Sequence, residues 1–145
     1  MEEIQEQLKE RRKDKWFDVW ASIEALAVEK HVVESALKKH IEKMKKIKEI
    51  LVYEEQYSDT LKVENPMKDV KEGHAQLVKV KFMAKDLITL INVVMVYGPS
   101  SIEIMSPNKK ELSLSEAQNI VNALAGVVHQ FAAAGIGGIV ITPDK

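Results

Sequence analysis

The chain of 145 residues contains no cysteine. This absence excludes a disulfide scaffold, a thiolate nucleophile, and zinc or iron–sulfur sites built on cysteine ligands. Redox chemistry would therefore require a bound cofactor. No cofactor-binding motif is present, so we expect none.

An excess of either charge is also lacking, because 21 Lys and Arg stand against 22 Asp and Glu. A protein that coats nucleic acid carries a strong positive excess, so we do not expect a nucleic acid partner. No apolar run approaches the roughly 20 residues of a membrane span. The charged start MEEIQEQLKERRKDK also differs from a signal peptide. We expect a soluble cytoplasmic protein with no membrane contact.

Hydrophobic residues make up 46% of the chain, which is enough for one domain with a core. We predict a charged helical arm at residues 1–15 and a single α+β domain at residues 16–145. Within it, residues 16–106 would form a βαββαβ core. Residues 113–142 would add a C-terminal helix and a short strand.

The first half of that core depends on a change of period. Polar and apolar residues alternate in WFDVWASIEALA, from Phe17 to Ala27, which predicts a strand. Apolar residues then recur at helical spacing in VVESALKKHIEKMKKI, and ILVYEEQY predicts a second strand. Neither glycine nor proline interrupts residues 1–51, so one continuous helix is the alternative. The change of period near His31 favours separate elements.

The second half repeats this order. Residues 58–74, which are charged and contain Pro66 and Gly73, predict a long connection, and residues 75–84 alternate as a strand. Asp86 can cap a helix that Gly98 ends, and a short strand follows at residues 101–105. The whole order is that of a ferredoxin-like sandwich, a plan that hosts many unrelated functions.

A final helix is predicted from Ser113 or Ser115 to Gly135, followed by the strand GIVIT. It is apolar around most of its circumference, which is typical of a buried helix. We expect a second copy of the chain to cover it, as a symmetric homodimer joined through residues 113–134. Covering by the N-terminal arm of the same chain is the alternative. The apolar positions are Ala117, Ile120, Val121, Leu124, Val127, Val128, Phe131 and Ala132.

Few side chains suggest chemistry. The four histidines are scattered, so we expect no metal site, and we assign no catalytic residue. Gln118, Asn122 and His129 share a polar strip of the final helix, which indicates a ligand contact or an interface. Glu24 and Glu103 lie within predicted strands. An enzyme that uses Glu24, Glu103 or His129 at a dimer interface is a second hypothesis.

The helix predicted after the first strand also carries a basic patch, which makes weak nucleic-acid binding through residues 38–48 a third hypothesis. Glu42 and Glu49 interrupt the patch, and the third strand lacks the aromatic residues that stack on RNA bases. A solvated helix face explains it better. The patch consists of Lys38, Lys39, Lys43, Lys45 and Lys46.

The stretch VKVKFMAKDLITLINVVMVYGPSSIEIMSP, residues 78–107, resembles the C-terminal extension of WYL-domain regulators. In that extension a strand and a helix lead to a tyrosine-glycine turn, a strand and a proline, here Tyr97, Gly98 and Pro107. No WYL domain stands before it in this sequence, so the resemblance transfers no ligand residues. The chain as a whole resembles small prokaryotic ferredoxin-like proteins. We therefore expect a non-catalytic dimer that binds a small ligand or a protein partner in a regulatory role.

Overall fold

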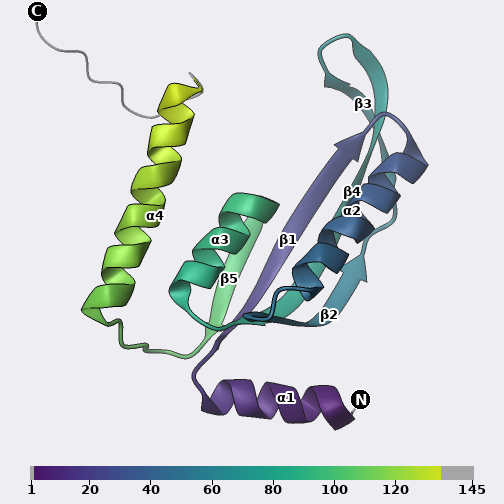
Figure 1. Ribbon diagram of the computed structural model, residues 1–145. Helices are drawn as coiled ribbons and strands as arrows, with labels where there is room; N and C mark the ends of the chain where they lie inside the picture. Colours follow the sequence, from purple (N-terminus) through teal and green to yellow (C-terminus); the bar gives the residue numbers. More distant parts are fainter. Residues whose placement is uncertain (1, 135–145) are drawn as a thin grey trace, which may run out of the picture. The chain divides into compact units, whose positions relative to one another are not determined.

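The computed structural model describes residues 2–134, which fall into two compact units, residues 1–110 and 111–145 (Figure 1). The first unit is a mixed α+β structure, and the described part of the second is one helix. The elements of the first are α1 (Glu2–Lys13), β1 (Phe17–Ala27), α2 (Lys30–Lys45), β2 (Ile50–Tyr57), β3 (Leu61–Met67), β4 (Val70–Ala84), α3 (Leu87–Tyr97) and β5 (Ser101–Ser106); that of the second is α4 (Leu114–Ala133).

The five strands of the first unit form one antiparallel sheet in the order β2-β4-β1-β5. Strand β3 pairs with the first half of β4, beyond the end of β2. Helices α2 and α3 lie on the same face of the sheet (Figure 1). The long central strands β1 and β4 therefore carry most of the core.

The core lies between this sheet face and the two helices. On β1 the buried residues Val19, Ala21 and Ile23 pair with Phe82, Val80 and Val78 of β4. Every second residue of these strands points at the helices, as the period of two requires. The helices complete the core with Leu37, Ile41 and Met44 from α2 and with Leu90, Val93 and Tyr97 from α3.

The predicted separation of residues 1–51 into arm, strand and helix is confirmed, and a continuous helix is wrong. Helix α1 ends at Lys13, Lys15 has a φ of 64°, and β1 begins at Phe17. Good helix formers enter a strand here because the alternating apolar residues of β1 gain more by burial than propensity offers.

The predicted caps are also present. The Asp86 carboxylate accepts a hydrogen bond from the Thr89 backbone N–H at 3.0 Å, and Gly98 ends α3 with a φ of 51°. A left-handed residue is needed there to turn the chain out of the helix, and glycine adopts it without a Cβ clash. At the start of α4, Ser113 accepts a hydrogen bond from the Glu116 N–H.

The long connection predicted at residues 58–74 is wrong, because the structure forms a hairpin there from β3 and the first half of β4. Lys68 and Asp69 make the turn, and Pro66 lies over Gly73, where a Cβ would come within 2.8 Å of the proline ring. The segment has few apolar residues, and its two strands are linked by charged pairs such as Lys62 and Glu72. Without a buried face, the sequence shows no period of two.

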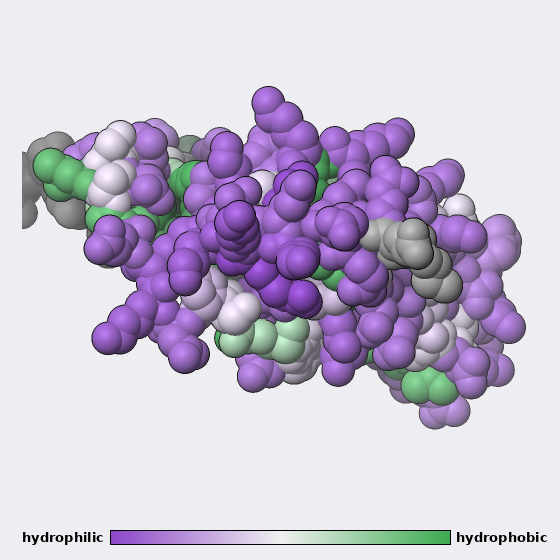
Figure 2. Space-filling view, turned by 90° about the horizontal axis from the view of Figure 1, so that it is seen from below, coloured by the Kyte–Doolittle hydropathy of each residue, from purple (hydrophilic) through white to green (hydrophobic). Residues whose placement is uncertain are grey.

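The first helix packs on the other face of the sheet, at one end. Leu8 of α1 is buried, and Arg12 lies 3.8 Å from the carboxylate of Asp18 on β1. The Tyr53 hydroxyl donates a 2.6 Å hydrogen bond to the same carboxylate. Around α1 the surface seen from below in Figure 1 is mostly hydrophilic (Figure 2). The charged arm thus uses its few apolar residues on its own sheet.

Tyr53 makes the protein sensitive to alkaline pH. Burial, and then the hydrogen bond to Asp18, raise the Tyr53 pKa above its ordinary value of 10.0. The folded state therefore favours the protonated phenol, and the resulting stability is present below pH 10 and lost above it. We expect the free energy of unfolding in urea to fall less above pH 10 in Tyr53→Phe than in the native chain. An equal fall in both proteins would contradict this.

Candidate ligand pocket

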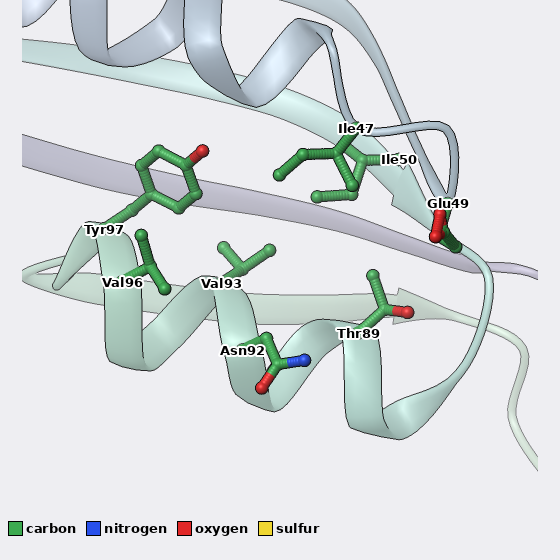
Figure 3. Close-up of a pocket in the computed structure, with 8 residues that line it drawn as sticks. All are labelled: Ile47, Glu49, Ile50, Thr89, Asn92, Val93, Val96 and Tyr97. Atoms are coloured by element: carbon green, nitrogen blue, oxygen red, sulfur yellow. The ribbon is translucent and has the colours of Figure 1, made fainter.

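A pocket opens between α3 and the segment that joins α2 to β2 (Figure 3). Its volume is about 180 Å³, which is the space of roughly six water molecules. Two stretches of chain about forty residues apart meet here. The lining residues are Ile47, Glu49, Ile50, Thr89, Asn92, Val93, Val96 and Tyr97.

Most of this pocket is apolar. Ile47 and Ile50 form one side, and Val93 and Val96 of α3 form the other, with Tyr97 at one end (Figure 3). Residues three and four apart on a helix lie on one face, which is why α3 presents several of its side chains here. The pocket therefore offers hydrocarbon walls to a bound molecule.

Glu49 and Thr89 lie at the other end of the pocket, while Asn92 lies nearer the middle of α3 (Figure 3). The backbone there is held by a hydrogen bond from the Lys85 N–H to the Glu49 carbonyl at 2.9 Å. The Oε2 atom of Glu49 is buried, and no described residue donates a hydrogen bond to it. Thr89 donates its hydroxyl hydrogen to Asp86, while the exposed Asn92 amide can donate or accept. A buried acceptor without a donor is costly, so Glu49 Oε2 is the atom of the pocket that most needs a hydrogen-bond donor from a ligand.

A second hollow, also of about 180 Å³, lies beside Tyr97. The His40 ring stands edge-on to the Tyr97 ring, with the centroids 4.5 Å apart, and His40 Nε2 is 3.5 Å from the Tyr97 carbonyl oxygen. Burial raises the pKa of the Tyr97 hydroxyl, so the phenol stays protonated at neutral pH. The hollow is lined by Ile23, Glu24, Ala25, Ala36, Leu37, His40 and Tyr97.

The two strand carboxylates singled out in the sequence do not meet. Glu103 on β5 accepts a 2.8 Å hydrogen bond from the Trp20 indole N–H, and Lys79 lies 4.5 Å from the centre of that ring. Glu103 pairs with Trp20 in the sheet, whereas Glu24 lies four positions further along β1, a distance of about 13 Å. Both carboxylates belong to exposed residues.

On α4 the predicted polar strip forms in part. Gln118 donates a 3.3 Å hydrogen bond to the side-chain oxygen of Asn122, and His129 lies two turns beyond Asn122 on the same side. All three residues are exposed. Gln118 and Asn122 are thus joined in the strip, and His129 lies apart from them on the same side of the helix.

The basic patch on α2 is exposed throughout, but one of its members is engaged. Lys45 forms ion pairs with Glu55 and, at 3.4 Å, with Glu42. The hydrogen bond to Glu55 is the main cause that raises the Lys45 pKa, against a smaller opposing effect of burial. The remaining lysines of the patch, Lys38, Lys39, Lys43 and Lys46, are exposed.

Two searches of the structure were negative. Among residues 2–134, no three His, Asp or Glu side chains gather in a way that would hold a metal ion. No helix within that range is both long and apolar enough to cross a membrane. The strand predicted at GIVIT, which completes residues 113–142, lies outside the described part of the chain.

The pocket residues Glu49, Thr89 and Asn92, and also His40, were not predicted as site residues. Glu49 was noted only as an interruption of the basic patch, whereas Thr89 and Asn92 are polar positions in an otherwise apolar helix. Those two polar positions are the signal that could have been followed. Nothing local to Glu49 indicates that α3 packs beside it.

Fold and pocket together define an antiparallel α+β protein with a small, largely apolar pocket between α3 and the segment that joins α2 to β2. Residues 18–133 match the MJ0538 family, and the chain belongs to this family. The matched region runs from β1 to the end of α4, so α4 is part of what the family shares. A search of the curated proteins found no match. The family match contains nothing of a WYL domain, and its description names no activity.

Proposed function

We propose that the protein is a non-catalytic homodimer that binds a small ligand in a regulatory role. The single observation that carries this proposal is α4, an amphipathic helix of 20 residues, none of which is buried within its own unit. The pocket beside α3 supports the ligand-binding part. The family match supports the importance of α4, because it extends to residue 133.

A ferredoxin-like sandwich is the frame of this proposal. Its support is the strand order β2-β4-β1-β5 with antiparallel neighbours, and the positions of α2 between β1 and β2 and of α3 between β4 and β5. The hairpin formed by β3 would be an addition to the plan. Such frames host many functions, so the function has to be argued from surfaces and pockets.

The apolar face of α4 spans roughly 140° of the helix, and the polar strip of Gln118, Asn122 and His129 lies outside it. Val121 is 60% exposed and Phe131 is 50% exposed. Burying a large apolar side chain contributes about 1.5–3 kcal/mol, so a helix of this kind gains by association. The face consists of Leu114, Ala117, Ile120, Val121, Leu124, Val127, Val128, Phe131 and Ala132.

A second copy is the partner that this face suits best. The other candidate was the N-terminal arm of the same chain, but α1 already buries Leu8 within the first unit, and Arg12 pairs with Asp18 there. Its remaining surface is strongly charged. A symmetric pair brings like apolar faces together and needs no further protein.

Ligand binding without catalysis is the interpretation that the pocket supports. Its walls are largely hydrocarbon, and its polar groups are a carboxylate, two hydroxyls and an amide, which bind and orient small molecules. The enzyme hypothesis depends on Glu24, Glu103 or His129. Glu24 and Glu103 are exposed and apart, and Glu103 is already bonded to Trp20, so no observation favours that hypothesis.

Light scattering on the purified protein tests the dimer. We expect a mass of two chains of 16.4 kDa at micromolar concentration, because no described residue of its own unit covers the apolar face of α4. The mass of one chain under those conditions would contradict the proposal. The oligomeric state is independent of any ligand, so this measurement leaves the pocket to be tested separately.

A further inference from the structure

We infer that the pocket beside α3 takes a small organic cation, a primary ammonium carried on a short apolar body, with the ammonium bound by Glu49. This inference rests on the proposed function, because it names the ligand of the same pocket. Two features of the pocket support it: the Glu49 carboxylate has a buried oxygen without a hydrogen-bond donor, and the remaining walls are largely hydrocarbon (Figure 3).

The carboxylate of Glu49 determines the charge of the ligand. Its Oε2 is shielded from water and lacks a hydrogen-bond donor among residues 2–134. A charged acceptor in that state is strongly unfavourable, and hydrogen bonds to charged groups contribute about 1.5–3 kcal/mol. An ammonium supplies both the opposite charge and up to three donors, so it satisfies this atom better than a neutral donor.

The rest of the polar end also favours a donor. Thr89 uses its hydroxyl hydrogen on Asp86, so toward the pocket it can act only as an acceptor. The Asn92 amide can supply one more acceptor. An anion would lie beside Glu49 with no described cation in the lining, and like charges at short range repel.

The walls and volume determine the body of the ligand. Ile47, Ile50, Val93 and Val96 offer no hydrogen bonds, so the body that contacts them is apolar. A volume of about 180 Å³ admits roughly six to eight non-hydrogen atoms. A straight or branched alkylamine of that size fits this description, and a nucleotide does not.

The test compares three probes of one length, hexylamine, hexan-1-ol and hexanoate, titrated into the full chain at neutral pH. Chemical shifts of the Thr89 and Asn92 amides report the pocket. We expect hexylamine to bind at least about tenfold more tightly than hexan-1-ol, and hexanoate to leave these resonances unchanged. Hexylamine should also raise the unfolding temperature by mass action.

Two variants and a control complete the test. Glu49→Gln should weaken hexylamine binding about 10- to 100-fold and leave hexan-1-ol binding unchanged. Asn92→Asp, at an exposed position of the lining, should strengthen hexylamine binding, and it does so without removing a buried group. Glu64→Gln, on the exposed strand β3, removes the same charge away from the pocket and should change nothing.

Each outcome separates the inference from the proposed function. If hexan-1-ol or hexanoate binds as tightly as hexylamine, or Glu49→Gln has no effect, the inference that the ligand is a cation is wrong. The proposal of a ligand pocket at this place then remains. If none of the three probes shifts Thr89 or Asn92, the inference fails together with ligand binding at this pocket. The dimer measured by light scattering is unaffected by either result.

Discussion

Replacing Leu124 with Glu is expected to convert the proposed dimer into a monomer. Leu124 lies in the middle of the apolar face of α4, between Ala117 and Phe131, each one heptad away. A carboxylate there would be buried without a partner in both copies, which costs at least about 3 kcal/mol and raises the dimer dissociation constant more than a hundredfold. Light scattering over a dilution series measures this change.

The matched control is Asn122→Glu, which places the same charge on the polar strip of α4 instead. Glutamate is a good helix former, so neither substitution should unfold the helix, and circular dichroism verifies this. We expect Asn122→Glu to remain dimeric. Equal dissociation by both variants would indicate a general effect of charge, and no dissociation by Leu124→Glu would remove α4 from the interface.

Replacing Phe82 with Ala is expected to destabilise the first unit by about 3–5 kcal/mol. Phe82 lies at the middle of the sheet, fully buried, and it pairs with Val19 of β1 on one side and Val52 of β2 on the other. Its loss leaves a cavity in a layer that is packed by two helices, and such cavities collapse only partly. Urea unfolding measures the difference in free energy.

Leu61→Ala provides the comparison, since Leu61 is an apolar residue of β3 that is 65% exposed. We expect a change within about 0.5 kcal/mol. A similar loss in both variants would mean that burial in this structure does not rank the stability of its side chains. A small loss for Phe82→Ala alone would place the core elsewhere than between the sheet and the helices.

Much of the secondary structure was predictable from local patterns. The alternation from Phe17 to Ala27 and the caps at Asp86, Gly98 and Ser113 each correspond to an element or an end in the structure. Caps are decided by one or two side chains next to the backbone they bond, so they are visible in the sequence. The hairpin of β3 was missed because both of its faces are largely solvated, which leaves no alternation to detect.

The site could not be predicted in the same way. Glu49 and Thr89 line one pocket although forty residues separate them, and no residue near either indicates the other. Their proximity follows from the position of α3 beside the start of β2, which is set by packing of the whole helical layer. Glu24 and Glu103, the carboxylates of the second hypothesis, stood out in the sequence only because they lie within predicted strands.

The sequence by itself determined the change from a period of two to a helical period, the helices and strands of residues 16–106 other than β3 and the start of β4, and the apolar character of α4. These depend on neighbours within a few positions, where side-chain direction repeats with the backbone. Only the tertiary structure decided that α1 packs on its own sheet and that residues 58–74 form a hairpin. It alone also decided that Glu49 lines a pocket and that its buried oxygen has no hydrogen-bond donor among the described residues. Those features require surfaces from distant parts of the chain to meet, and burial is a property of the assembled fold.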